Sequence, residues 1–264
     1  MTLTRLVRIP VLAPLIAMAF VISLGTAASA QTQIATRISE VPESHPLMPA
    51  LRAGQKALTE FDEVTDYEAV FVKKEIVGGQ MIEQRMQIRF REKPFSVRLK
   101  FIEPNEGREV LYIDGRNGNK MLVQETGLAS LVGPVSLDPR GSLAMQHTVH
   151  PITQIGVKNM MHRLLDVWLA ESDQTQIDVK FYPNARIGKT SCEVIEATHP
   201  QQAQNITYHK VRLYVDKDSG LPIRVQHLGF PKGDGAKEPI IADYAYLSMK
   251  TNIGLTDRDF AIGN

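Results

Sequence analysis

The chain has 264 residues, of which 43% are hydrophobic and 22% are charged. Its 30 lysines and arginines nearly balance its 29 aspartates and glutamates, and this balance argues against a nucleic-acid-binding protein, which needs a basic excess. A single cysteine, Cys192, excludes an internal disulfide, so the fold must rely on its hydrophobic core.

Residues 1–30 have the features of a secretory signal peptide. Arg5 and Arg8 form a basic start, an apolar run extends from Val11 to Leu24, and Ala28-Ser29-Ala30 fits a cleavage site. The apolar run is short for a membrane-spanning helix. We therefore predict cleavage after Ala30 and a periplasmic or secreted protein. Without Arg5 and Arg8 the formal net charge changes from +1 to −1.

The next segment, residues 31–49, is polar and contains three prolines, so we predict a loose leader. A helix follows from about residue 50 to Phe61, because proline at position 49 suits a helix start. Leu51, Ala57 and Leu58 share one face of this helix with Phe61.

Residues 67–124 predict a series of strands. Gly78-Gly79 separates two of them and is typical of a tight hairpin turn. In 84–91 the apolar residues Met86, Ile88 and Phe90 alternate with polar ones, and in 95–101 every second residue is apolar, as in strands with one apolar face. Two shorter strands follow at 109–113 and 120–124. The polar positions of 84–101 form a basic stripe. A stripe of this kind can meet phosphate headgroups, but we interpret it as the solvated side of a sheet.

Periodicity is lost between residues 125 and 151, where glycines and prolines predict a long loop. Residues 152–170 then predict a helix with a broad apolar face, and Thr153 is its candidate cap. This helix is expected to cover the open side of a curved sheet.

The last third of the chain predicts further strands at 176–182, 187–198 and 240–249, with a hairpin at 208–230. In the hairpin, Val211, Leu213 and Val215 alternate with polar residues, and the turn ends at Gly220. About ten strands and two helices without βαβ spacing indicate a mainly β (α+β) protein with antiparallel pairing.

Three segments together resemble the outer-membrane lipoprotein-sorting superfamily, the fold of the periplasmic lipoprotein carrier. They are Gln84 to Asp114-Gly115 with its Lys93-Pro94 turn, V-D-K-D-S-G-L-P-I-R-V at 215–225, and the tail from Asn252 to Phe260. The whole chain is most similar to a secreted bacterial family known as a domain of unknown function.

The resemblance implies a single domain over residues 50–264, shaped as a curved, unclosed antiparallel barrel with helices on its concave side. It also implies an apolar cavity that accepts acyl chains. The family has an arginine before the strand-ending proline that helps to hold a lid. Here the latch candidate is Lys93, a point charge without the planar guanidinium fork.

The apolar faces supply the candidate cavity residues, although the same pattern would arise if these side chains filled a core. They come from strands 84–101 and 211–215 and from helix 152–170: Met86, Ile88, Phe90, Val97, Leu99, Phe101, Leu213, Val215, Met161, Leu164 and Trp168.

No motif indicates catalysis, a metal or a cofactor. His147, His150 and His162 lack a matched acidic ligand at metal-binding spacing. Ser142 lies outside a Gly-x-Ser-x-Gly sequence, and Cys192 lies in a strand pattern that favours a buried thiol. We predict a non-enzymatic carrier that sequesters the acyl chain of a lipid or lipidated protein. The alternative is an envelope sensor or protein-interaction module on the same fold, with an envelope protein as its partner.

Overall fold

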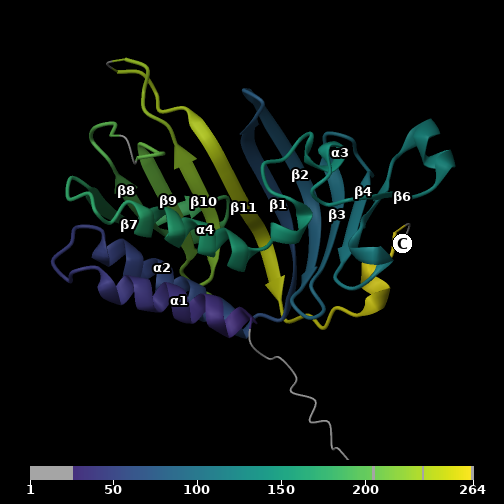
Figure 1. The fold of residues 1–264 in the computed structure, drawn as a ribbon, viewed down its shortest axis with the longest axis horizontal. Coiled ribbons are helices and arrows are strands. Elements are labelled where there is room, and N and C mark those ends of the chain that lie inside the picture. The colour runs from purple at the N-terminus through teal and green to yellow at the C-terminus, as the bar shows by residue number, and fades with distance from the viewer. Residues whose placement is uncertain (1–25, 204–205, 234, 263–264) are drawn as a thin grey trace, which may run out of the picture.

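The structure, a computed structural model, describes residues 26–203, 206–233 and 235–262 (Figure 1). Within them, the α-helices are α1 (Thr26–Glu40), α2 (Met48–Glu60), α3 (Ser142–Met145) and α4 (Val157–Ala170). The strands are β1 (Asp66–Val77), β2 (Gln80–Arg91), β3 (Ser96–Glu103), β4 (Glu109–Ile113), β5 (Met121–Gln124), β6 (Val135–Leu137), β7 (Asp178–Ile187), β8 (Thr190–Thr198), β9 (Lys210–Asp216), β10 (Pro222–Leu228) and β11 (Ile240–Thr251). Short 3-10 helices are η1 (Phe61–Glu63), η2 (Asn117–Asn119), η3 (Gly127–Val132), η4 (Ile152–Gln154) and η5 (Asp257–Phe260).

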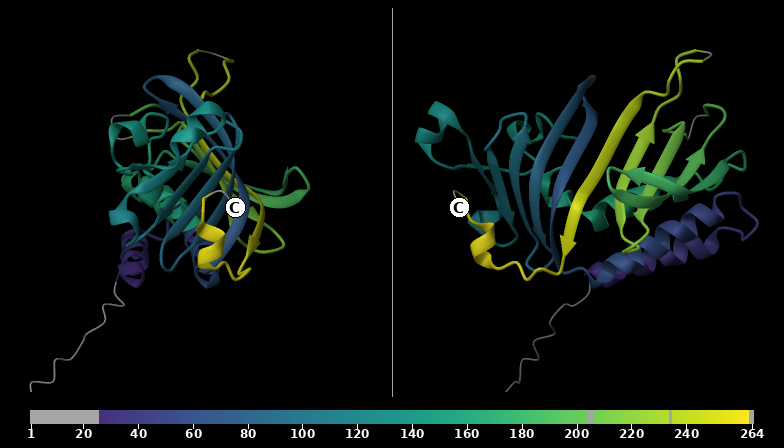
Figure 2. Two further views of the ribbon diagram at one scale, coloured as in Figure 1. Left: turned by 90° about the vertical axis from the view of Figure 1, so that its right-hand side faces the viewer. Right: turned by 180° about the vertical axis from the view of Figure 1, so that it is seen from behind.

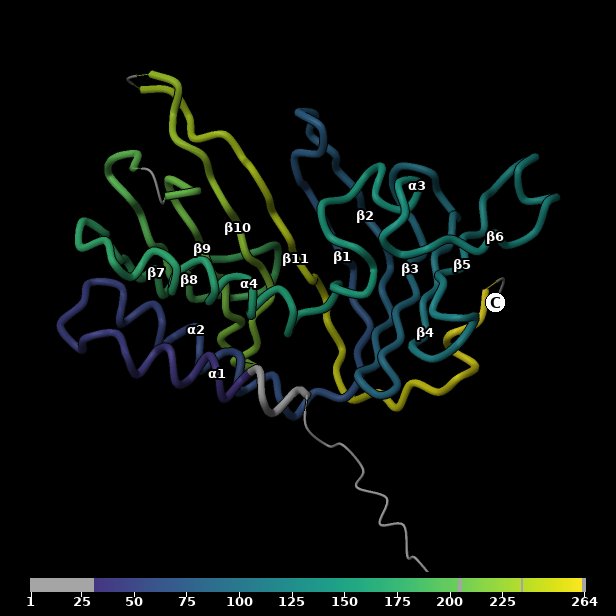
Figure 3. The backbone as a smooth tube through the Cα atoms, in the orientation of Figure 1, coloured from purple at the N-terminus to yellow at the C-terminus, as the bar shows by residue number. Residues whose placement is uncertain are grey.

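All eleven strands of the described chain form one antiparallel sheet in the order β6-β5-β4-β3-β2-β1-β11-β10-β9-β8-β7. Its edges, β6 and β7, lie at opposite ends of the molecule, so the sheet is curved but not closed (Figures 2 and 3). The predicted fold class is therefore confirmed. Several strand bounds differ. β2 begins at Gln80 instead of residue 84, and β8 begins at Thr190 instead of residue 187. β6 lies inside the predicted loop, and β7 continues to Ile187, with a bulge between Tyr182 and Ala185.

The sheet consists of two meanders, β1–β6 and β7–β11, which meet where β1 pairs with β11. The chain must therefore pass from one edge of the sheet to the other between β6 and β7. This connection, residues 138–177, contains α3, η4 and α4 and crosses the concave face (Figure 1). The long crossing brings loop and helix over the apolar side of the strands, where the site lies.

The concave face follows directly from the alternation of side chains along the strands. Across four neighbouring strands, Tyr246 is paired with Phe71, Phe71 with Met86, and Met86 with Phe101. All four side chains are buried, together with the apolar side chains of α4. A strand directs every second side chain to the same face, so one row of large residues lies next to another along the sheet.

Helix α4 is held on this face at its first turn. Gly156 precedes it with φ 126°, a conformation that L-residues rarely adopt, and a Cβ there would lie 2.8 Å from the Phe90 ring. The amides of Gly156 and Val157 donate to the hydroxyls of Tyr246 (3.2 Å) and Tyr67 (3.3 Å). The helix thus begins at Val157 rather than at 152, and the predicted cap Thr153 lies instead in η4, because side chains of the sheet accept from the exposed amides.

The prediction of a loose leader at 31–49 is wrong. Residues 31–40 belong to α1, and Ile34 and Ile38, one turn apart, are 4% and 5% exposed in the main core. Arg37 also pairs with Asp166 on α4 at 2.5 Å. The polar composition reflects the outer face of an amphipathic helix that packs beside α2 and α4 (Figure 1). The folded unit therefore begins before residue 50.

Residues 1–25 of the predicted signal peptide lie outside the described residues, and the cleavage point after Ala30 falls within α1. Cleavage there stays a prediction. Among the described helices, none has both the length and the apolarity to cross a membrane.

The convex face is partly covered by the C-terminal segment. Phe260 is buried against Leu111 and Ile113 in a second, small apolar cluster. Asp257 accepts hydrogen bonds from Arg91 (2.9 Å) and Arg116 (2.5 Å). The predicted basic stripe is thus only partly solvated, because the tail, distant in sequence, supplies carboxylates to it.

Candidate functional site

Most of the predicted cavity residues lie in the packed core. Val215 is half-buried, and the other ten are at most 7% exposed. Trp168 and Leu164 are completely buried on α4, and Ile88, Val97 and Leu213 are equally inaccessible on the strands. Three of the predicted residues, Met86, Leu99 and Phe101, line a pocket. Most of the predicted cavity residues therefore form part of the hydrophobic core. Only the three that line the pocket face open space.

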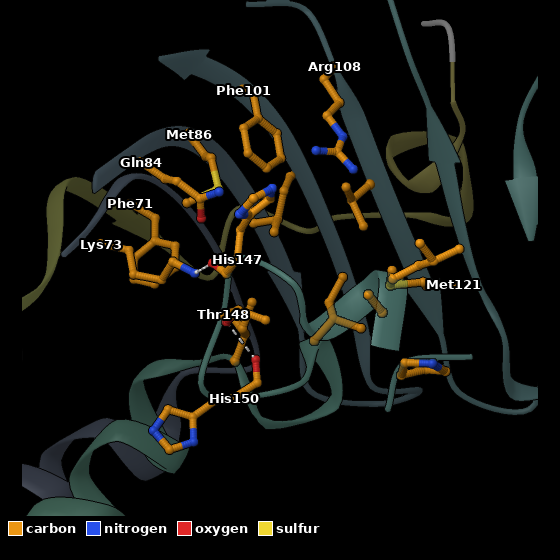
Figure 4. A pocket seen from close by; sticks show the side chains of 17 residues that line it. Phe71, Lys73, Gln84, Met86, Phe101, Arg108, Met121, His147, Thr148 and His150 are labelled. Carbon is orange, nitrogen blue, oxygen red and sulfur yellow. Dashed lines mark hydrogen bonds between the residues drawn. The ribbon is translucent and has the colours of Figure 1, made fainter. Parts of the chain in front are cut away.

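The pocket lies on the concave face of β1–β5, beneath residues 139–155, which we call the strap (Figure 4). The sheet contributes mostly apolar side chains to its wall: Phe71, Met86, Leu99, Phe101, Val110 and Met121. The strap contributes residues between Pro139 and Ile155, including Leu143 and Ala144. The pocket volume is about 80 Å³, smaller than the roughly 150 Å³ of an engineered apolar cavity that holds benzene.

The strap is attached to β1 through a buried ion pair. Lys73 and Glu75 lie on the concave face, 6% and 1% exposed, with Nζ and Oε1 2.7 Å apart. Lys73 Nζ also donates to the carbonyl of His147 (3.1 Å), and the Val149 amide donates to Glu75 Oε1 (3.0 Å). Tyr244 of β11 donates its hydroxyl to Glu75 Oε2 at 2.7 Å. The carboxylate therefore connects two strands and the strap.

The protonation states of this cluster favour the attached strap. Burial raises the pKa of Glu75, but the Lys73 ammonium and the hydrogen bonds from Lys73, Tyr244 and Val149 together bring it below its ordinary value. Burial lowers the pKa of Lys73, and Glu75 opposes that change. Burial and the adjacent Glu75 raise the pKa of Tyr244, so its hydroxyl keeps the proton that it donates.

The pocket is followed along the concave face by two further spaces. A small one of about 20 Å³ shares Phe71, Lys73 and Ile155 with the pocket. A groove of about 450 Å³ shares Glu75 and other residues with the small space and reaches α4, β10 and β11. His150 lines all three. The Lys73–Glu75 pair and His150 thus form a polar partition between an apolar pocket and a larger groove.

The latch candidate Lys93 is exposed in the turn between β2 and β3. It makes no ion pair or hydrogen bond with any residue that the structure describes. The strap is held instead by Lys73 and Glu75, from another strand.

The three histidines considered for a metal site lie in two different elements. His147 and His150 lie in the strap and line the pocket, whereas His162 lies on α4. No group of three or more His, Cys, Asp or Glu side chains arranged to hold a metal occurs in the described part of the chain. Cys192 is completely buried, as expected, and burial raises the pKa of its thiol.

Sequence reasoning missed the charged and polar residues of the site: Lys73, Glu75, Tyr244, Arg163 and His227. A signal was present for the first two. Because strand side chains alternate, the inward-facing Phe71 places Lys73 and Glu75 on the same buried face. Opposite charges at i and i+2 on such a face predict a buried pair, since unpaired charges are rarely buried.

Searches of curated proteins and of solved structures gave different results. The search of curated proteins found no match. Among solved structures, the Mycobacterium tuberculosis lipoprotein LppX is 14% identical, with a TM-score of 0.44 over 79% of this chain and 98% of that chain. LprF from Mycobacterium bovis is 12% identical, with a TM-score of 0.39 over 84% and 99% of the two chains. A LolA superfamily protein from Nitrosomonas europaea is 14% identical, with a TM-score of 0.31 over 80% and 97%.

The region of the chain that matches a protein family includes all the described strands of the sheet. A family described as protein of unknown function (DUF1571) matches residues 64–264. Helices α1 and α2 precede the matched region. This agrees with the predicted likeness to a domain of unknown function, and the chain belongs to the DUF1571 family.

Proposed function

We propose that this protein is a periplasmic, non-enzymatic carrier-like module that binds the acyl chain of a lipid or a lipidated protein under the strap. The observation that carries the proposal is the pocket on the concave face, with its wall of aliphatic, aromatic and methionine side chains. Such walls favour apolar ligands without fixing one shape, because methionine adapts to varied partners.

The small volume of the pocket means that the protein must change conformation to bind a long acyl chain. At about 80 Å³ the pocket is closed to a long acyl chain, since small-molecule sites commonly measure several hundred Å³. The strap must therefore lift from β1 when a chain enters, joining the pocket to the groove beyond it. Each methylene that is then buried contributes about 0.8 kcal/mol, against the cost of ordering the chain.

The experiment that tests the proposal uses an uncharged ligand and a variant that fills the pocket. Isothermal titration of delipidated protein with 1-dodecanoylglycerol should show binding, and Ala144→Phe should weaken it at least roughly tenfold by occupying the space. Ala144 is half-buried in the strap and lines the pocket. Ala185→Phe, at a half-buried position on the edge strand β7, is the matched control.

The binding result decides the proposal. Equal loss in both variants would point to general destabilisation. Absence of binding to the wild-type protein, together with no lipid in organic extracts of protein purified from the periplasm, would refute the carrier function.

A second candidate, an envelope sensor or protein-interaction module, is favoured by a specific surface feature. At the tip of the β5–β6 hairpin, η3 exposes Leu128, Leu131 and Val132 by 88%, 84% and 81%. Adjacent large apolar side chains with this exposure are typical of interaction sites. With a photo-activated cross-linking residue at position 128, an envelope protein should be captured in intact cells, and Leu131→Ser should abolish the cross-link without changing 1-dodecanoylglycerol binding.

A further inference from the structure

The groove beyond the polar partition contains a guanidinium without a carboxylate partner. Arg163, on α4, is half-buried and lines both the groove and the small space. One of its amino groups, Nη1, donates to the carbonyl of Gln154 at 3.0 Å. No ion pair among the described residues includes it. Arginine presents five N–H donors, so most of its hydrogen-bonding capacity is left for another acceptor.

The acidic residues near the groove are already neutralised. Glu75 accepts from Lys73, Tyr244 and the Val149 amide. Asp166 pairs with Arg37. The two carboxylates that line the groove are thus matched by two other cations, and the charge of Arg163 has no counter-charge there. A half-buried cation in this position attracts an anion more strongly than one in bulk water, because the effective dielectric constant is lower.

A second, independent feature lies on the opposite wall of the same groove. His227 of β10 is 7% exposed, and its Nδ1 is buried without a hydrogen-bond partner in the described structure. Buried polar atoms are rarely left unpaired. Burial, with smaller effects of Arg163 and His150, lowers the pKa of His227 to about 4, so its ring is neutral at pH 7. A neutral ring can donate one hydrogen bond to an anionic oxygen.

The remainder of the groove is largely apolar. Ile76, Met160, Val167 and Ile241 line it together with the rings of Tyr208 and Tyr244. A free anion would leave this apolar surface uncovered, whereas a lipid would cover it with its chain while its headgroup meets the polar groups. A single ligand that contacts both the Arg163 charge and the apolar surface of the groove must therefore be an amphiphile.

We propose that Arg163 and His227 bind the anionic headgroup of a lipid whose acyl chain runs from the groove beneath the strap toward the pocket. This inference rests on the proposed carrier function and adds the class of ligand to it. The headgroup oxygens would accept from the free N–H groups of Arg163 and contact the ring of His227, which lines the same groove.

The test compares two ligands with the same chain, dodecanoate and 1-dodecanoylglycerol, by isothermal titration at pH 7 below micelle-forming concentrations. Hydrogen bonds to charged groups contribute about 1.5–3 kcal/mol, and each 1.4 kcal/mol is about tenfold in affinity. We expect the wild-type protein to prefer dodecanoate by roughly tenfold or more. Arg163→Gln should remove this preference and leave 1-dodecanoylglycerol within about twofold of its original affinity.

Two matched variants control for charge and folding. Lys158→Gln makes the same change in net charge on the same helix, but Lys158 pairs with Asp62 and does not line the groove. It should leave the preference unchanged. Arg163→Lys keeps the charge without the planar fork and should keep part of the preference. Circular dichroism checks the fold of each variant.

The outcomes separate this inference from the proposed function. Binding of both ligands by the wild-type protein with equal affinity overturns the headgroup site and leaves the carrier function standing. So does an equal loss of both ligands in Arg163→Gln. Acetate that competes as strongly as dodecanoate would show a site for free anions rather than for a lipid. If the wild-type protein binds neither dodecanoate nor 1-dodecanoylglycerol, the carrier function and the inference are both wrong.

Discussion

Replacing Glu75 by glutamine removes the carboxylate that joins β1, β11 and the strap. The side chain is 1% exposed, so the remaining Lys73 ammonium is left without a counter-charge in the protein interior. Breaking a buried ion pair by removing one partner costs about 3–5 kcal/mol. Glutamine keeps one oxygen that can accept from Tyr244, so we expect the free energy of unfolding to fall by an amount near the lower limit, about 3 kcal/mol.

The control is a pair on the same strand at the surface. Glu68 pairs with Lys250 at 2.8 Å, but the two side chains are 35% and 69% exposed. Exposed pairs contribute about 0–1 kcal/mol, so Glu68→Gln should change the free energy of unfolding by less than about 1 kcal/mol. Both values come from urea denaturation followed by circular dichroism.

The double variant Lys73→Met/Glu75→Gln distinguishes the charge effect from loss of packing. Replacing a whole buried pair by less polar side chains is often neutral or stabilising, so the double variant should recover most of the stability that Glu75→Gln loses. Both variants should still release the strap, because each alters the acceptor for the Val149 amide. The double variant also removes the donor to the His147 carbonyl. Hydrogen exchange at residues 147–150 should accelerate in each.

The reasoning would be refuted by either of two results. If Glu75→Gln is no more destabilising than Glu68→Gln, the pair does not act as a buried charge pair. If exchange at 147–150 stays slow in the double variant, the strap is held by other contacts, and its opening cannot depend on Glu75.

Three further predictions follow from the packing and the titration. Ile38→Ala should lower the free energy of unfolding by about 2 kcal/mol or more in urea denaturation, whereas Glu40→Ala, exposed on the same helix, should have little effect; equal small effects would restore the loose leader. Gly156→Ala should cost about 3 kcal/mol or more in the same assay, because backbone strain adds to overpacking against Phe90; Gly79→Ala, also at positive φ but with no atom within 4 Å of a Cβ, should cost less. For His227, the folded pKa of about 4 lies below the unfolded value of 6.5, so the unfolded state binds the proton first as the pH falls. Stability should therefore decline between pH 6.5 and about pH 4, by about 3 kcal/mol from this residue, and His227→Gln should remove that part of the decline; a wild-type profile identical to that of the variant would contradict the buried neutral ring.

The predicted strands and turns follow from local patterns that need no knowledge of the rest of the chain. Met86, Ile88 and Phe90 alternate with polar residues, and Gly78-Gly79 has the positive φ angles that its hairpin turn requires. The same applies to the hairpin of β9 and β10, whose turn ends at Gly220 with φ 73°. The alternation of apolar and polar residues and the residue types of a hairpin turn are both local features that extend over a few residues. Antiparallel pairing was therefore predictable from the sequence.

Where each apolar or charged face is buried depends on residues far apart in the chain. Considered by themselves, residues 31–40 look polar. Ile34 and Ile38 are buried because α1 packs against α2 and against α4, which lies far away in the sequence. The sequence by itself determined most of the strands, their antiparallel class and the apolar face, but not β6. The tertiary structure decided that most of this face is packed core, that its open spaces include the pocket under the strap and the groove beside α4, and that Lys73, Glu75, Arg163 and His227 line these spaces. Burial is a property of contacts between distant segments, and a local pattern does not contain them.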